Sequence, residues 1–161
     1  MDDTINDVVV ALRRLRTSHG NDQVTREQNW IINHLASSEL KQIVPHLSIV
    51  ALHILSALEH GERTGVELAQ QQNVTKGGIT RAARKLGQFK LVETVKHSDD
   101  KKKIFYHLTV AGIEIARQHD QMHQVIQQRM IDQITNEYSA DELRLVARFM
   151  NDLSDHEDEF K

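Results

Sequence analysis

The sequence predicts a mainly α-helical fold with one small β-hairpin, an α+β class, and three observations support this. Apolar residues recur at helical spacing on both sides of the central region. Residues 91–96 and 104–108 are rich in branched and aromatic residues, as β-strands are. The stretch between them, His97 to Lys103, is wholly polar and suits an exposed hairpin tip. We therefore expect helices on either side of a single hairpin.

Composition excludes several classes of protein. The 161 residues are 39% apolar, enough for a core, and contain no cysteine. Disulfides, thiolate metal ligands and thiol redox switches are thereby excluded. No apolar run reaches the roughly 18 residues that span a bilayer, and the N-terminus is acidic rather than signal-like. We expect a cytoplasmic protein with no membrane partner.

The first 45 residues are predicted to be helical. An amphipathic helix is expected from Thr4 to His19 and a break at Gly20–Asp22. A second helix is expected from about Thr25, where Thr25 and Gln28 resemble a capping box, and Pro45 ends the segment. The inward faces are assigned to Ile5, Val8, Val9, Leu12 and Leu15, and to Trp30, Ile31, His34 and Leu35. These helices exceed what a small DNA-binding domain needs, so we expect residues 1–45 to contact a partner subunit.

The central residues 46–110 have the pattern of a winged helix-turn-helix domain. Ser48 is expected to cap a helix that ends at Glu59, and a short helix is expected to follow from Thr64. Residues 73–75 supply a turn and an N-cap, Thr75, for a second helix that Gly87 closes. Apolar residues give each of these two helices one apolar side, namely Val66, Leu68 and Ala69 in the first and Ile79, Ala82, Ala83 and Leu86 in the second. Helix, turn, helix and basic hairpin together predict a winged helix.

Charge is concentrated in the same domain. Residues 76–103 carry nine Lys or Arg and three Asp or Glu, a net +6, whereas the whole chain has a formal charge of −3. A basic segment in an acidic protein is typical of a surface that binds phosphates, with salt-sensitive affinity. A solvated helix face with a lysine-rich loop is the alternative. Coincidence with the helix-turn-helix pattern favours binding to double-stranded DNA.

Residues 111–161 are predicted to form two further helices. Thr109 caps a long helix through about Gln133, and a last helix begins at Ser139. The last helix is apolar over much of its circumference, with Leu143, Leu145, Val146, Phe149, Met150 and Leu153. We expect this segment to dimerise, the alternative being a monomer that folds its own tail back.

One ordered set of motifs resembles the MarR family of bacterial winged-helix regulators. It comprises T-K-G-G-I-T-R from Thr75 to Arg81, Leu86, Leu91–Val92, D-K-K at residues 100–102, and L-T-x-x-G from Leu108 to Gly112. The resemblance implies a homodimer whose second helix enters the major groove of a pseudo-palindromic operator. The DNA-binding residues it implies are Thr75, Lys76, Thr80, Arg81, Arg84, Lys85, Lys96, Lys101, Lys102 and Lys103. Gly77 and Gly78 either allow close approach to DNA or mark a frayed first turn.

Histidines provide a second signal. His119 and His123 are four residues apart, so a helix places both rings on one face at a spacing that suits one metal ion. The zinc-responsive branch of the MarR family has histidines at these positions and at that of His53, so the resemblance implies a zinc site. The fourth ligand stays open between Glu27, His34 and Glu39. The alternative to a metal site is that His119 and His123 are simply two exposed histidines and that His53 is a core histidine. A second, cysteine-containing site of that branch is not expected, since cysteine is absent.

The sequence leaves several hypotheses open for the effector and for the class of protein. Zinc or a related divalent ion, a small aromatic ligand in the dimer crevice, and no effector all remain open. We do not expect an enzyme, because no G-x-S-x-G, H-E-x-x-H or phosphate-binding glycine loop is present. A three-histidine hydrolytic zinc site and a helical interaction module that binds no DNA are the rival hypotheses.

Overall fold

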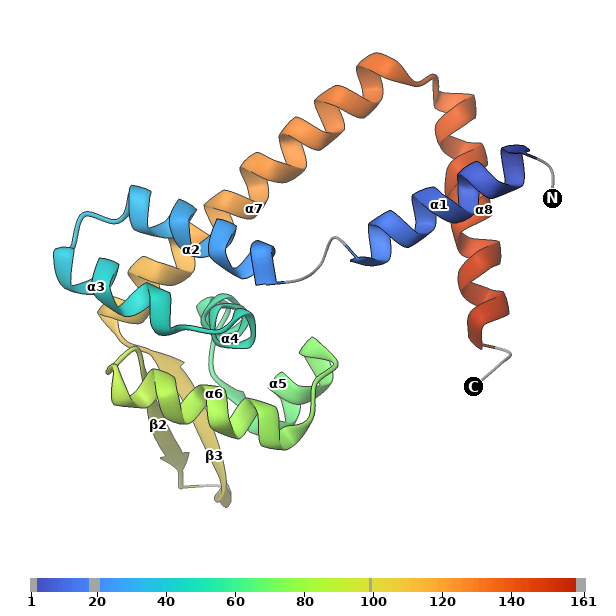
Figure 1. The fold of residues 1–161 in the computed structure, drawn as a ribbon. Coiled ribbons are helices and arrows are strands. Elements are labelled where there is room, and N and C mark those ends of the chain that lie inside the picture. Colours follow the sequence, from blue (N-terminus) through green and yellow to red (C-terminus); the bar gives the residue numbers. More distant parts are fainter. Residues whose placement is uncertain (1–2, 18–20, 99, 159–161) are drawn as a thin grey trace. The chain divides into compact units, whose positions relative to one another are not determined.

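A computed structural model describes residues 3–17, 21–98 and 100–158 (Figure 1). The helices are α1 Asp3–Thr17, α2 Asn21–His34, α3 Ser38–Ile43, α4 Ile49–Glu59, α5 Gly65–Gln72, α6 Lys76–Gln88, α7 Val110–Glu137 and α8 Ala140–Asp158, with a 3-10 turn η1 at Val44–His46. The strands are β1 Arg63–Thr64, β2 Val92–His97 and β3 Asp100–Leu108. The predicted mainly helical winged helix-turn-helix fold is confirmed. Residues 1–122 and 123–161 form two compact units, which divide within α7.

The core of the first unit is built around α4. Six of its eleven residues are buried, namely Ala51, Leu52, Ile54, Leu55, Ala57 and Leu58. Ser48 caps this helix as predicted, its hydroxyl accepting a hydrogen bond from Ala51 N at 3.2 Å. Full burial of one leucine or isoleucine stabilises the fold by about 1.5–3 kcal/mol. Since α4 contacts both α5 and α6, it holds the helix-turn-helix in place.

Local capping positions the two helices of the helix-turn-helix. Thr64 and Glu67 form a complete capping box at the start of α5. Asn73 ends α5 in the left-handed region, with φ 51°, and Thr75 caps α6 by accepting from Gly78 N at 3.1 Å. The prediction that Gly87 ends the second helix is wrong. The helix continues to Gln88, and the chain reverses at Lys90, which has φ 56°.

The sheet has one strand more than predicted. Its order is β1-β3-β2, all antiparallel, with Arg63 opposite Tyr106 and Thr94 opposite Tyr106 on the other side. The two-residue β1 carries no hydrophobic alternation, so sequence alone did not reveal it. The predicted tip, 97–103, is too long, because β2 extends to His97 and β3 begins at Asp100. The polar residues at the ends of the two strands pair through backbone hydrogen bonds. The pattern of side chains in the sequence gives no sign of this pairing.

The wing is joined tightly to α7. Thr109 caps α7 as predicted, its hydroxyl accepting from Gly112 N at 3.1 Å and donating to Lys90 O at 2.8 Å. A Cβ added at Gly112 would lie 2.1 Å from Leu91 O, so only glycine fits there. The helix then runs to Glu137, beyond the predicted end near Gln133.

The N-terminal helices differ from the prediction. α2 begins at Asn21, so Thr25 lies inside it and the predicted capping box is wrong; Gln28 Nε2 instead donates to Leu47 O at 2.8 Å. The rest of the segment is divided between α3, which Ser37 caps, and η1. Ile31 and Leu35 are buried as expected, but His34 is exposed and its Nδ1 lies 2.8 Å from Trp30 O. Residues 18–20, where a helix end and part of the break were predicted, lie outside the described residues.

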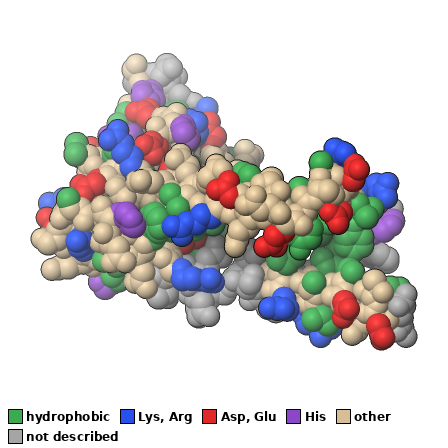
Figure 2. Space-filling view, turned by 90° about the horizontal axis from the view of Figure 1, so that it is seen from above, with side chains coloured by type: hydrophobic (Ala, Val, Ile, Leu, Met, Phe, Trp, Pro, Cys, Tyr) green, Lys and Arg blue, Asp and Glu red, His purple; other side chains and the backbone are tan. Residues whose placement is uncertain are grey.

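Apolar side chains are exposed on both units of the single chain. On α1, the face predicted to be inward leaves Ile5 and Leu15 exposed by 53% and 56%. In the second unit, no side chain of residues 123–156 is buried, although α7 and α8 present Ile126, Met130, Ile131, Leu145, Val146, Phe149 and Met150. In Figure 2, hydrophobic side chains reach the surface between interspersed acidic and basic ones. Among the described helices, none is both long and apolar enough to cross a membrane.

Candidate nucleic-acid interface and metal centre

α6 has one buried and one exposed face, as the recognition helix of a winged helix requires. Ile79, Ala82, Ala83 and Leu86 are buried. The opposite face exposes Thr75, Lys76, Thr80, Arg81, Arg84 and Lys85. Lys76, Arg81 and Arg84 form no ion pair with any described residue, and Lys85 lies 4.9 Å from the centroid of the Phe89 ring. Three cations are thus presented to solvent on one side of the helix.

Two of the predicted DNA-binding threonines already have partners in α6. The Thr75 hydroxyl is the N-cap acceptor, and the Thr80 hydroxyl donates to Lys76 O at 2.9 Å. Gly78 N donates to that cap, so the first turn is formed rather than frayed. A Cβ at Gly78 would lie 3.3 Å from the Thr75 hydroxyl, whereas a Cβ at Gly77 would meet nothing within 4 Å. Gly77 therefore leaves the exposed first turn of α6 without a side chain.

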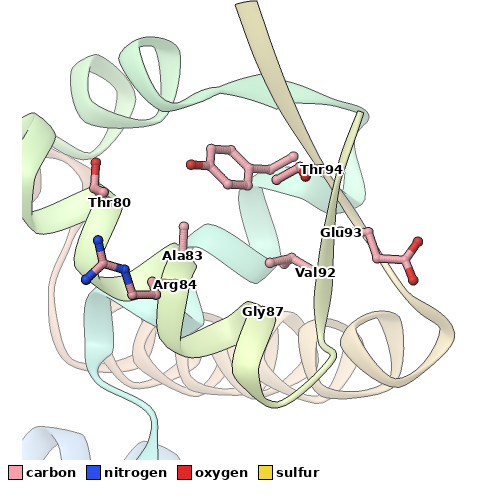
Figure 3. Close-up of a pocket in the computed structure, with 8 residues that line it drawn as sticks. Thr80, Ala83, Arg84, Gly87, Val92, Glu93 and Thr94 are labelled. Atoms are coloured by element: carbon pink, nitrogen blue, oxygen red, sulfur yellow. The ribbon is translucent and has the colours of Figure 1, made fainter. Parts of the chain in front are cut away.

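A groove lies between α6 and the wing (Figure 3). Its volume is about 570 Å³, and its lining includes Thr80 and Arg84 of α6, Glu93 and Thr94 of β2, and Tyr106 of β3. In Figure 3, Arg84 and Thr80 project from the same side of α6. Glu93 lies 3.3 Å from His107 Nε2 across the two strands. The strand residues of this groove were not predicted, because their polar character shows no periodicity that distinguishes them from other exposed strand residues.

The wing carries the remaining predicted cations. Lys96 and Lys103 are exposed, whereas the side chains of Lys101 and Lys102 lie outside the described residues. The tip end of the hairpin is held by His97, whose Nε2 lies 2.6 Å from Glu62 Oε2 and whose ring packs edge-on against Phe105. The structure thus connects the wing to the segment that precedes β1.

Four side chains from three helices meet in a second candidate site. Glu27 of α2, His53 of α4, and His119 and His123 of α7 each offer one ligand atom, and these atoms all lie within 4.8 Å of one another. We call these four residues the His/Glu cluster. His119 is 2% exposed and Glu27 4% exposed. Of the three candidates for the fourth ligand, the structure brings Glu27 to the histidines, whereas His34 and Glu39 are exposed and not in the group.

The geometry of the cluster fits a divalent ion such as zinc. His119 Nε2 lies 3.3 Å from Glu27 Oε2, and the rings of His53 and His119 meet edge-on with centroids 5.5 Å apart. Three imidazoles and one carboxylate form a donor set that zinc accepts in tetrahedral sites. A carboxylate is costly to bury in an apolar core unless a cation or hydrogen bonds compensate it. The residues present therefore fit the ion that the spacing of the histidines indicates.

Two neighbours of the cluster were not predicted. Ser56 Oγ lies 2.7 Å from His119 Nδ1 and 2.5 Å from Asp120 Oδ1. Ser56 follows His53 by three residues on α4, and Asp120 follows His119 directly. The i, i+3 spacing of Ser56 from a candidate ligand was the available signal, but serine is too common for that signal to be specific.

Fold and site together define a winged helix-turn-helix protein with a candidate metal centre, and comparisons refine this class. No family model matches the chain. An uncharacterised HTH-type transcriptional regulator, YvnA of Bacillus subtilis, is 30% identical over 105 residues, 65% of this chain and 66% of that protein. The transcriptional regulator AdcR of Streptococcus pneumoniae is 29% identical over 142 residues, 81% of this chain and 95% of AdcR.

Solved structures show the same fold. The adhesin competence repressor AdcR of Streptococcus pyogenes has a TM-score of 0.63 at 20% identity and covers 97% of both chains. ZitR of Lactococcus lactis, a zinc-responsive MarR family member, has a TM-score of 0.63 at 22% identity over 71% of this chain and 77% of ZitR. A ZitR point mutant in complex with DNA has a TM-score of 0.62 at 21% identity over 71% of this chain and 76% of that one. The chain is thus similar to HTH-type transcriptional regulators, and it has the fold of ZitR, a MarR family member.

Proposed function

We propose that the protein is a homodimeric repressor that binds a pseudo-palindromic operator through α6 and the wing, with zinc as its corepressor. The observation that carries the proposal is the His/Glu cluster, whose four ligand atoms lie within 4.8 Å of one another in a winged helix-turn-helix chain. The DNA complex and the zinc response of the ZitR structures support the same combination of partners.

DNA binding is supported by the exposed face of α6. Lys76, Arg81 and Arg84 have no acidic partner among the described residues, so their charges are available to phosphates and base edges. Either arginine suits a bidentate contact to guanine, and Lys96 and Lys103 suit the phosphates beside the wing. The wing tip, by contrast, carries lysines without the planar fork of arginine, which favours phosphate contact over insertion into the minor groove.

Dimerisation is supported by the exposed apolar side chains of α1, α7 and α8. Residues 123–156 bury no side chain although Ile126, Met130 and Leu145 are each more than half exposed. Exposed apolar stripes of this kind mark a protein interface, and a second copy of the chain is the partner that a closed two-fold dimer provides. Two recognition helices related by that axis would contact half-sites about one helical turn apart.

The connection from metal to DNA runs through α4. Zinc bound by the His/Glu cluster would supply a positive charge that holds α2, α4 and α7 together. Leu52 and Leu55 of α4 share one core with Ile79 and Leu86 of α6. A change in the position of α4 is therefore transmitted to the recognition helix through packed side chains. The ion raises DNA affinity only by its differential affinity for the geometry that binds the operator.

The test is a DNA-binding titration of chelator-stripped protein against its own upstream region, with and without micromolar zinc. We expect zinc to tighten binding, and His119→Ala or His123→Ala to remove that gain. Because His123 is exposed whereas His119 is buried, only His123→Ala is expected to leave the zinc-free affinity unchanged. DNA binding that zinc does not alter would leave a MarR-type regulator and overturn the corepressor. An organic ligand would then become the leading effector hypothesis.

A further inference from the structure

A hydrogen-bonded chain lies behind one residue of the His/Glu cluster. It runs from Asp120 through the hydroxyl of Ser56 to His119 Nδ1, with distances of 2.5 Å and 2.7 Å. Ser56 belongs to α4 and the other two residues to α7, so the chain connects two of the three helices that form the cluster. Asp120 Oδ1 is also 3.5 Å from His119 Nδ1. The Ser56 hydroxyl and the Asp120 carboxylate thus both place an oxygen atom near this nitrogen.

The order of donors and acceptors follows from the chemistry of the three groups. A carboxylate only accepts hydrogen bonds, and a hydroxyl has one proton to donate. The Ser56 hydroxyl therefore donates to Asp120, and its oxygen lone pair faces His119 Nδ1. A contact of 2.7 Å is favourable only if Nδ1 bears the proton and donates it to Ser56. A neutral imidazole has one N–H, so Nε2 then carries the lone pair.

The other side of the ring faces the centre of the cluster. His119 Nε2 is the nitrogen that faces Glu27, at 3.3 Å from its Oε2, inside the cluster. A metal ligand must present a lone pair, and its second ring nitrogen usually donates to an oxygen that fixes the ring. Both requirements are met by the same tautomer.

We propose that Ser56 and Asp120 are positioning residues that hold His119 as the Nδ1–H tautomer, so that Nε2 is the atom that binds the ion. This inference rests on the proposed metal function of the cluster. The contact with Ser56 holds the ring orientation before an ion arrives, which lowers the cost of binding. Loss of such an outer partner weakens metal affinity by about 10- to 100-fold.

The first experiment needs no metal. Long-range ¹H–¹⁵N spectra of the chelator-stripped chain, recorded above the pH range in which imidazoles titrate, report which ring nitrogen of His119 bears the proton. We expect Nδ1–H in the unaltered chain and a mixture of tautomers in Ser56→Ala. The Nε2–H form in the unaltered chain would overturn the proposal whether or not zinc binds, so this result is separate from a failure of the metal hypothesis.

The second experiment measures zinc affinity by competition with a chelator. Ser56→Ala is expected to bind zinc about 10- to 100-fold more weakly, and Ser56→Thr, which keeps the hydroxyl, to restore most of that loss. Glu59→Gln is the matched control, because it removes the Glu59–Arg117 ion pair, at 3.5 Å another link between α4 and α7, without contacting His119. Unchanged affinity in Ser56→Ala, or an equal loss in Glu59→Gln, would refute a positioning role. Absence of zinc binding in the unaltered chain would instead refute the proposed function.

Discussion

The proposed recognition surface, on α6 and the wing, and the His/Glu cluster are built in opposite ways. The recognition surface comes from one stretch, residues 75–103, and its cations on α6 are exposed. The cluster combines residues 27, 53, 119 and 123 from three helices, and two of its members are almost fully buried. A surface from one stretch depends on local capping, whereas a buried cluster exists only when distant helices have packed.

This difference determines how substitutions act in each region. An exposed cation can be removed with a change in stability of about 0.5 kcal/mol or less, because water replaces it. A buried ligand cannot be removed without altering both the ion's coordination and the core around it. The two regions should therefore respond differently to substitution. Variants of the His/Glu cluster should lower zinc affinity, whereas variants of the exposed cations should lower only DNA affinity.

The largest effect is expected for Glu27→Gln. The amide has the size of the carboxylate but lacks its charge, so zinc affinity should fall by at least about 100-fold, more than for a typical outer partner. The zinc-induced rise in melting temperature should disappear with it. Chelator competition and thermal unfolding measure the two quantities.

Glu39→Gln is the matched control for this variant. Glu39 is the other acidic candidate for the fourth ligand, and it is exposed on α3. We expect it to bind zinc like the unaltered chain. A loss of zinc binding in Glu39→Gln rather than in Glu27→Gln would place the fourth ligand elsewhere and break the contrast between buried cluster and exposed surface.

Arg84→Ala should affect only the other region. If Arg84 contacts a guanine, operator affinity falls by about 1–3 kcal/mol, roughly 5- to 150-fold, while zinc affinity and the melting temperature stay unchanged. Fluorescence anisotropy with a labelled operator measures the loss. Arg117→Ala removes the same charge from an exposed α7 site that pairs with Glu59, and it should leave DNA affinity unchanged. Equal losses in both variants would indicate a general charge effect instead.

The same contrast explains what could be predicted from the sequence. Ser48, Thr75 and Thr109 were identified as caps because a cap and the backbone N–H that donates to it lie within three residues. Helix ends without such a signal were missed, as at Gly87, where the chain reverses three residues later at Lys90. β1 was missed because a two-residue edge strand is defined by its partner, β3, and not by its own side chains.

The candidate site was predictable only in part for the same reason. His119 and His123 stand out by their spacing, since one helix places them together. Glu27 could not be distinguished from His34 or Glu39, because the choice depends on how α2 packs against α4 and α7. Ser56 and Asp120 contact the cluster through a hydroxyl, and no spacing rule singles out such a residue.

Lys76→Gln should have a smaller effect than Arg84→Ala. A lysine that neutralises one phosphate contributes to affinity independently of sequence, so its loss should weaken operator and random DNA equally. The slope of log affinity against log salt should become shallower by about 1. Titrations at several salt concentrations measure the slope. A loss confined to the operator would assign Lys76 to base contact instead of phosphate contact.

The smallest effect is expected in the capping box of α5, which supports the recognition surface from within its own stretch. The backbone N–H of Thr64 and, after it, the Thr64 hydroxyl donate to the Glu67 carboxylate and lower the pKa of Glu67 below its ordinary value of 4.5. A carboxyl whose pKa is lower in the folded chain stabilises the fold above its unfolded pKa. This contribution is lost as the pH falls through the lowered value. Glu67→Gln should thus be slightly less stable than the unaltered chain at pH 7, and the difference should vanish well below pH 4.5.

Thr64→Ala is the matched comparison, since it removes the hydroxyl cap at every pH and should cost about 1 kcal/mol throughout. Denaturant unfolding at a series of pH values distinguishes the two curves. If the loss of unfolding free energy in Glu67→Gln stays constant down to acid pH, the role of Glu67 is packing. The charge of its carboxylate then does not stabilise the start of α5.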